Sequence, residues 1–78
     1  MSPRKLSGLN GRHVVRALER AGFVVLRVSG SHHVLGKPGA SGTRVIVPVH
    51  GARDLPPGTV RSIIAQANLT IEEFLSLL

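Results

Sequence analysis

The sequence has no cysteine, tryptophan or tyrosine, and phenylalanine supplies its only two large aromatic rings, Phe23 and Phe74. Without cysteine, the chain cannot form disulfide bonds, thiolate zinc sites or cysteine nucleophiles. With so few rings, stacking of single-stranded bases is not expected to dominate nucleic-acid binding. No apolar run approaches the roughly 20 residues of a membrane-spanning helix, and residues 1–9 lack the apolar middle of a signal peptide. We therefore expect a prokaryotic cytoplasmic protein with no membrane partner.

Acidic residues are also few. Four aspartates and glutamates stand against ten lysines and arginines, so the formal net charge is +6 and the pI is about 11.8. Residues 1–53 contain nine of the basic residues and a single acid, Glu19, whereas residues 54–78 contain Arg61 and three acids. A basic body favours a polyanionic partner, and nucleic acid is the commonest one. The alternative is a solvated basic surface in an arginine-rich protein.

The length of 78 residues and the mass of 8.3 kDa allow one domain with one small core. Apolar residues make up 42% of the chain, which is too many for a disordered segment. We interpret residues 1–78 as a single domain in which residues 1–7 form a flexible basic leader.

Helical periodicity marks two longer segments. Apolar residues recur at helical spacing over residues 10–21 and again over residues 57–67. Asn10 can cap the start of the first helix. Gly22 and Asn68 can take the left-handed backbone conformation that commonly ends a helix.

Three segments rich in β-branched and apolar residues, 23–28, 32–36 and 44–49, predict strands. The sequence Ser29-Gly30-Ser31 indicates a turn or a bulge between the first two. Residues 37–43 have the composition of a hairpin loop. Pro48 has no backbone N–H, so it is expected at a sheet edge or near the end of its strand.

A short last helix follows the capping box formed by Thr70 and Glu73. Its apolar stripe comprises Ile71, Phe74, Leu75 and Leu78. The predicted order is therefore α-β-β-β-α with one short extra helix. We predict an α+β fold similar to the double-stranded-RNA-binding domain, with a three-stranded antiparallel sheet, helices on one face and a short C-terminal helix.

Histidine is the candidate for chemistry, at positions 13, 32, 33 and 50. His13 falls in the first turn of a helix and is interpreted as a solvated residue. His32 and His33 must point to opposite faces of the sheet, because adjacent side chains on a strand alternate. Alternation alone does not say which face is exposed. Two half-exposed histidines without a function are an equally good local interpretation.

Other kinds of site have little support. His32 or His33, with His50 and Asp54, match no zinc-ligand spacing, and zinc needs three or four ligands in fixed geometry. We therefore expect no metal and no cofactor. A triad of Ser31, His32 and Asp54 is disfavoured because adjacent strand side chains point apart and no oxyanion loop is evident. The glycines form no phosphate-binding fingerprint, since no helix follows them directly.

A histidine on a basic surface is sufficient for one reaction, the cleavage of RNA without a metal. RNA carries its own nucleophile, the 2′-hydroxyl, which an imidazole can deprotonate near neutral pH. Arginine can hold the phosphate through two hydrogen bonds. This favours a ribonuclease. The alternatives are a non-catalytic RNA-binding module of the same fold and a domain that only binds a protein partner.

Three motifs together resemble the HicA toxin family. They are G-S-H-H at residues 30–33, V-P-V-H at 47–50 and G-T-x-R-x-I-x-x-Q-A at 58–67, and the likeness extends over about residues 7–75. The resemblance implies an mRNA-cleaving toxin of a toxin–antitoxin pair, a fold like the double-stranded-RNA-binding domain, and neutralisation by a HicB-type antitoxin. It assigns the catalytic histidine to His32 and its neighbouring glycine to Gly30.

The sequence departs from the family's pattern in two places. Asn68 stands where glycine is frequent, and asparagine tolerates the same backbone conformation. Residues 34–36 lack the aromatic side chain often found after the histidines.

The site that we predict has His32 as general acid or base. Gly30 and Ser31 are expected to let the backbone approach the substrate and to orient the imidazole ring. Arg27, Lys37 and Arg44 are expected to hold phosphates. His33 and His50 are also expected to bind RNA or to shape the site, and the residues do not indicate which role His50 takes. The expected partners are mRNA and an antitoxin with an acidic surface, with no small-molecule cofactor.

Overall fold

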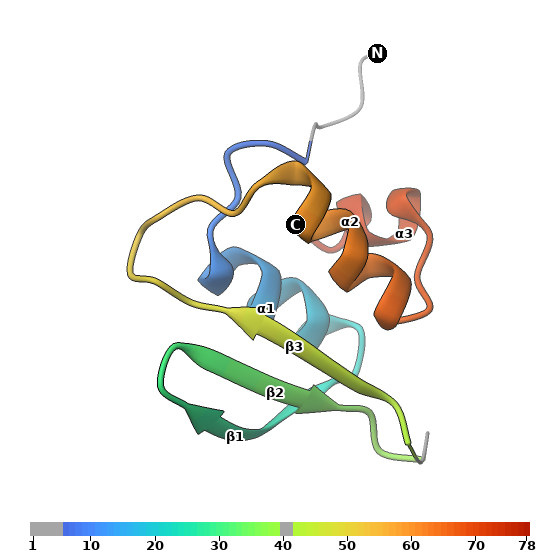
Figure 1. The fold of residues 1–78 in the computed structure, drawn as a ribbon. Coiled ribbons are helices and arrows are strands. Elements are labelled where there is room, and N and C mark those ends of the chain that lie inside the picture. The colour runs from blue at the N-terminus through green and yellow to red at the C-terminus, as the bar shows by residue number, and fades with distance from the viewer. Residues whose placement is uncertain (1–5, 40–41) are drawn as a thin grey trace.

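The computed structural model describes residues 6–39 and 42–78 of the chain. Its elements, in chain order, are α1 (Gly11–Arg20), β1 (Val24–Ser29), β2 (His32–Gly36), β3 (Arg44–Pro48), α2 (Pro57–Gln66) and α3 (Ile71–Ser76) (Figure 1). This order confirms the predicted α+β fold with its short C-terminal helix. The loop expected between β2 and β3 includes residues 40 and 41, which lie outside the described residues.

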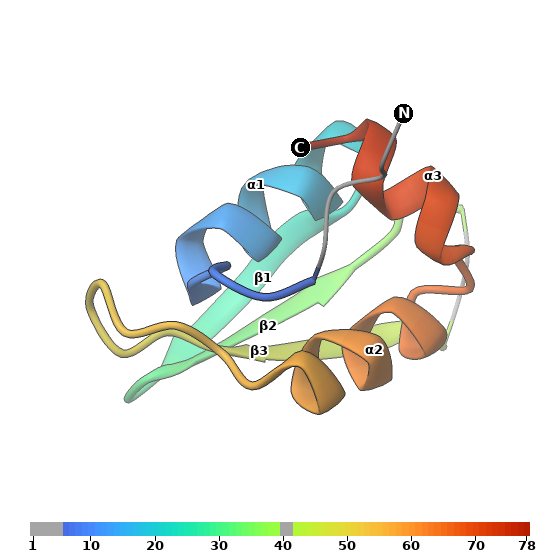
Figure 2. The same cartoon turned by 90° about the horizontal axis from the view of Figure 1, so that it is seen from above.

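The three strands form one antiparallel sheet in the order β1-β2-β3, so β2 is the central strand. Figure 2 looks down on α1 and α2, with the paler sheet behind them. Both helices therefore lie on one face of the sheet, as predicted, and we call this the covered face. The opposite face, which no described element covers, is the open face. Pro48 is the last residue of edge strand β3, which confirms its expected position.

The core lies between the covered face and the three helices. Leu18, Leu35, Val60 and Phe74, each from a different element, are fully or almost fully buried. Burying one such side chain stabilises the fold by about 1.5–3 kcal/mol. Ile71, predicted in the same stripe as Phe74, is 44% exposed. That prediction was wrong because Ile71 is the first residue of α3 and lies beyond the edge of the core.

Part of the predicted leader also belongs to the core. Leu6 is 7% exposed and joins the buried cluster. Residues 1–5 of that leader lie outside the described residues. Leu6, which the prediction placed in a flexible leader, is therefore part of the folded domain.

The ends of the helices follow the predicted signals. The N–H of Phe23 donates to the carbonyl of Leu18 across Gly22, whose φ is 99°. Asn68 has a φ of 59° at the corresponding place after α2. Both values lie in the left-handed region, which confirms the two predicted helix ends. Phe23, predicted as the first strand residue, belongs instead to the ending of α1, so β1 begins one residue later.

Helix α1 begins with a capping box in which histidine takes the place usual for glutamate. The N–H of His13 donates to Oδ1 of Asn10 at 3.0 Å, and the N–H of Asn10 donates to Nδ1 of His13 at 3.2 Å. These two hydrogen bonds confirm the prediction that Asn10 caps the start of α1. His13 is exposed, as predicted, but its ring also has a structural role that the sequence did not indicate.

Candidate functional site

The turn between β1 and β2 is made by Gly30 and Ser31. Ser29 pairs with His32 across it, which leaves two central residues. Gly30 has a φ of 58°, whereas Ser31 does not have a positive φ. A positive φ at the first central position alone is typical of a type II′ turn. Apart from its two neighbours in the chain, no residue comes within 4 Å of a Cβ built on Gly30, so glycine is needed there for its backbone conformation and not for space. The turn makes His32 the first residue of β2.

His32 and His33 point to opposite faces of the sheet. His33 pairs with Val47 and lies two residues from Leu35, and both of these apolar side chains are fully buried on the covered face. His33 is accordingly half-buried beneath α1, whereas His32 is exposed on the open face. The helices determine which face of the sheet is covered. Alternation along the strand alone therefore does not predict which of the two histidines is exposed.

A β-bulge brings Arg27 to the same face as His32. Val25 pairs with Leu35 but Arg27 pairs with Val34, so Leu26 is an additional residue in β1. Without the bulge, Val25 and Arg27 would lie on the same face, because they are two residues apart. With it, Val25 faces the core and Arg27 faces outward. Re-aiming a side chain in this way is a known effect of bulges.

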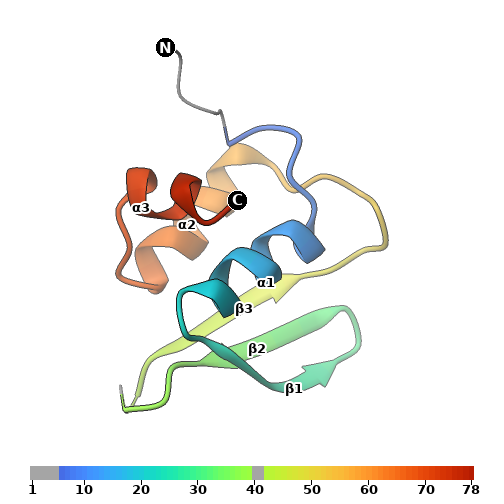
Figure 3. The same cartoon turned by 180° about the vertical axis from the view of Figure 1, so that it is seen from behind.

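Three segments meet at the end of the sheet where His32 lies (Figures 1 and 3). The N–H of Val49 donates to the carbonyl of Ser31 at 2.6 Å, so the chain after β3 is tied to the β1–β2 turn. The backbone of Gly11 in α1 lies against Pro48 and Val49. We call this region the histidine end, comprising residues 29–33, residues 48–50 and the first turn of α1. His50 belongs to it and is exposed.

Lys37 and Arg44 lie at the other end of the sheet. Arg44 pairs with Gly36, four residues along β2 from His32, which is about 13 Å at the usual rise of a strand. Nζ of Lys37 lies 5.6 Å from the centroid of the Phe23 ring, and Nη1 of Arg44 donates to the carbonyl of Thr43 at 2.9 Å. Of the three basic residues predicted to hold phosphates, the structure therefore brings only Arg27 close to His32.

The open face is apolar at its centre. Val24, Leu26 and Ile46 are 44–49% exposed there, and Val34 is half-buried between them. We call these four residues the apolar patch. Arg27 and Arg44 line the same shallow hollow as Leu26 and Ile46. The open face thus combines an apolar centre with cationic margins.

The described residues, 6–39 and 42–78, contain neither a cluster of metal ligands nor a membrane-spanning helix. No three of their histidine, aspartate or glutamate side chains are grouped so that they could hold a metal ion. None of its helices is long and apolar enough to cross a membrane.

Sequence reasoning missed several residues in and near the histidine end. The bulge at Leu26 leaves no signal that distinguishes it from a regular strand. The close contact of Gly11 depends on a segment 37 residues away in the chain. Arg12 and Arg16 are four residues apart on α1. This spacing was visible in the sequence and indicates that both side chains lie on one face of the helix.

The comparison with protein families finds a match. The model of a family described as "HicA toxin of bacterial toxin-antitoxin" matches residues 11–69 of the 78-residue chain. The matched range includes α1, the whole sheet, α2 and all four histidines. The comparison with curated proteins found no match.

Proposed function

The chain belongs to the HicA toxin family of bacterial toxin–antitoxin systems, and we propose that it is a metal-independent endoribonuclease that cleaves mRNA. His32 is the general acid or base of this reaction. As a toxin of such a pair, the protein has an antitoxin partner. We propose that this partner is a HicB-type protein with an acidic surface.

The observation that carries this proposal is the position of His32. Its side chain is exposed on the open face, and Arg27 lies on the same face of the adjacent strand. A phosphodiester beside His32 is therefore within reach of both a proton acceptor and a cation that neutralises its charge. A pure RNA-binding surface needs the cation but has no use for the histidine.

The reaction needs two proton transfers, one from the attacking 2′-hydroxyl and one to the leaving 5′-oxygen. His32 accepts the proton of the 2′-hydroxyl, and the oxygen attacks the adjacent phosphorus. The bond from phosphorus to the 5′-oxygen breaks, and that oxygen takes up a proton from water as it leaves, while His32 later returns its own proton to solvent. The products are a 2′,3′-cyclic phosphate and a free 5′-hydroxyl. Arg27 contributes by holding the phosphate with charge-assisted hydrogen bonds.

The type II′ turn supports the same role. Gly30 has no side chain, and no described atom lies within 4 Å of the place where a Cβ would stand. A substrate can therefore approach the turn backbone closely. The bond between Val49 and Ser31 fixes the turn to β3, which keeps the His32 backbone in one position.

The apolar patch supports a protein partner on the open face. Aliphatic side chains that are almost half exposed offer no hydrogen bonds to a nucleic acid and no rings on which bases stack. A protein surface with an apolar centre and acidic margins would match both the patch and the arginines Arg27 and Arg44. An antitoxin bound in this way also covers His32.

The test is cleavage of RNA by purified wild type and His32→Ala. We expect the variant to lose a factor of about 10² to 10⁴ in rate, the usual size of a general acid–base contribution. Its melting temperature should stay close to that of wild type, because the exposed ring of His32 adds little packing. Cleavage by His32→Ala at the wild-type rate would refute the assignment. A wild type that binds RNA but leaves it intact would favour the non-catalytic module.

The same pair of proteins should be induced in cells. Wild type is expected to stop growth and to shorten mRNA, and His32→Ala is expected to do neither. His33→Ala should retain more of the cleavage rate than His32→Ala, since its ring is on the covered face.

A further inference from the structure

A small hollow opens between α1 and the sheet, on the face opposite to His32. It has a volume of about 160 Å³ and is lined by Arg12, Val15, Arg16, Glu19, His33 and Val49. Sites for whole small-molecule ligands are usually larger, at about 300–1,000 Å³. The size suits one small polar group.

His33 presents an unused polar atom in this region. Its Nδ1 is buried and has no hydrogen-bond partner among the residues that the structure describes. Buried polar atoms in folded proteins are nearly always paired, with protein groups, water or a ligand. The His33 ring lines the hollow. In the tautomer that carries its proton on Nδ1, this buried atom is a donor, and the ring must shift slightly for a ligand in the hollow to reach it.

The charged residues of the hollow favour an anion. Arg12 and Arg16 lie four residues apart on α1, so their guanidinium groups share one side of the helix. They stand against the single carboxylate of Glu19. Within the described part of the chain, the guanidinium groups that donate hydrogen bonds belong to Arg20 and Arg44. Those of Arg12 and Arg16 are therefore available to a ligand.

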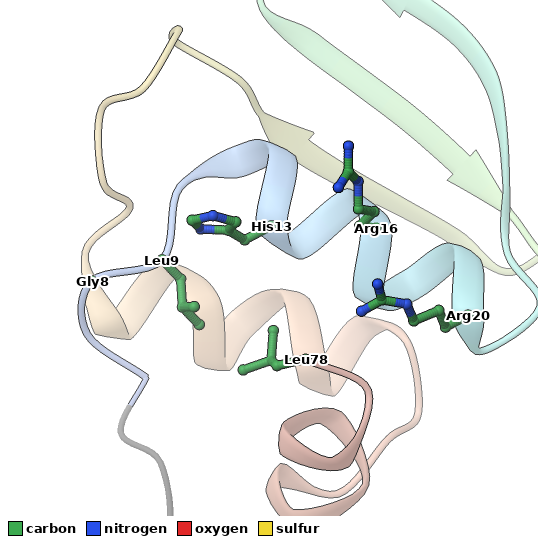
Figure 4. A pocket seen from close by; sticks show the side chains of 6 residues that line it. All are labelled: Gly8, Leu9, His13, Arg16, Arg20 and Leu78. Atoms are coloured by element: carbon green, nitrogen blue, oxygen red, sulfur yellow. The ribbon is translucent and has the colours of Figure 1, made fainter.

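Arginine side chains continue along α1 from this hollow. Arg16 also lines a neighbouring pocket with His13 and Arg20 (Figure 4). In that view the three side chains succeed one another along the helix, while Leu9 and Leu78 form the facing wall. Arg16 and Arg20 thus extend the positive charge of the hollow along α1, starting next to the histidine end.

We propose that the hollow between α1 and the sheet binds a backbone phosphate of the RNA substrate. Arg12 and Arg16 hold the phosphate oxygens, and Nδ1–H of His33 donates to one of them. This inference rests on the proposed ribonuclease function, because it adds a second contact to the same substrate.

The proposal also defines the class of RNA. His32 and His33 are consecutive, with Cα atoms about 3.8 Å apart, yet their side chains lie on opposite faces. An RNA that contacts both must turn around the histidine end within a few nucleotides. A single strand can make that turn, whereas a base-paired helix is too stiff. The segment of the mRNA that contacts both faces is therefore unpaired.

The test measures binding separately from cleavage. A fluorescently labelled 2′-O-methyl RNA single strand has no free 2′-hydroxyl, so it is not cut by the proposed mechanism. Its Kd is measured by anisotropy at several salt concentrations for wild type, Arg12→Ala, Arg16→Ala and His33→Leu. Arg61→Ala is the matched control, because it removes the same charge from an exposed position on α2 outside the hollow.

We expect Arg12→Ala and Arg16→Ala each to weaken binding by about 5- to 10-fold. Each should also reduce the slope of log K against log salt by about 0.7, the value for one phosphate of a single strand. His33→Leu keeps an apolar body but loses the donor, and it should weaken binding by about 3- to 5-fold. Arg61→Ala should stay within about twofold of wild type, and a duplex of the same sequence should bind at least about tenfold more weakly.

Two results would overturn the proposal even if the protein cleaves RNA. In the first, Arg12→Ala and Arg16→Ala bind the single strand as Arg61→Ala does but lose affinity for the antitoxin, so that the hollow accepts an acidic side chain. In the second, inorganic phosphate at the same concentration as the RNA displaces it, which would show that the hollow is a site for free anions. Failure of wild type to cleave, with these binding changes present, would refute the ribonuclease and not the phosphate site.

Discussion

Gly11 at the start of α1 and Pro48 at the end of β3 are in backbone contact with no room for a side chain between them. A Cβ on Gly11 would lie 2.9 Å from Cα of Val49 and closer still to the carbonyl oxygen of Pro48. Both neighbours are backbone atoms, so a change of rotamer cannot relieve the contact. The glycine thus holds the first turn of α1 on the histidine end.

Gly11→Ala is expected to destabilise the protein by about 2 kcal/mol, as overpacking of a filled site usually does. For a domain of this size that lowers Tm by roughly 10 °C. The measurement is thermal unfolding followed by circular dichroism. Gly58→Ala is the control, because it lies in α2 with no atom within 4 Å of its Cβ position and should be neutral or slightly stabilising. An unchanged Tm for Gly11→Ala would contradict the close packing.

Arg27→Ala is expected to lower kcat/KM for RNA cleavage by about tenfold or more, the size of a lost charge-assisted hydrogen bond. Arg44→Ala should have a smaller effect, within about threefold, because Arg44 pairs at the far end of β2 from His32. Arg27→Lys keeps the charge and should recover part of the loss. Equal losses in Arg27→Ala and Arg44→Ala would mean that the substrate runs the whole length of the open face.

An all-deoxy oligonucleotide of a cleaved sequence is expected to remain intact. The reason is that the proposed nucleophile, the 2′-hydroxyl, is absent from DNA. EDTA should leave RNA cleavage unchanged, since an imidazole can supply the proton transfer. The measurement is gel electrophoresis of both strands with and without the chelator. Cleavage of the deoxy strand, or activity restored by added zinc or magnesium after chelation, would indicate a hydrolytic metal enzyme.

The antitoxin and RNA are expected to exclude each other, because the proposed antitoxin surface covers His32 on the open face. Association should be fast and should slow with added salt, since a basic toxin attracts an acidic partner over a distance. Replacing Arg27 or Arg44 by alanine should lower the on-rate more than it raises the off-rate. The test is titration of the preformed complex with RNA, with antitoxin release and RNA binding both measured. A stable ternary complex with full RNA affinity would show that the antitoxin acts from elsewhere.

Much of the fold follows from local chemistry that the sequence carries. Gly22 and Asn68 end their helices because glycine and asparagine tolerate a positive φ, and both have one in the structure. Gly30 marks the β1–β2 turn for the same reason. Pro48 lies at the end of an edge strand because it cannot donate to a ladder. Each of these constraints acts within a few residues, so the order of residues is sufficient to predict it.

The faces of the sheet were decided only by the tertiary structure. Alternation places His32 opposite to His33, but the helices packed on Leu35 and Val47 determine that His33 is covered and His32 exposed. The bulge at Leu26 then turns Arg27 to the face of His32. A bulge depends on pairing with a second strand, and pairing registers are properties of two segments together. The sequence therefore determined which residues are candidates for the chemistry, and packing across the sheet determined which of them share a face.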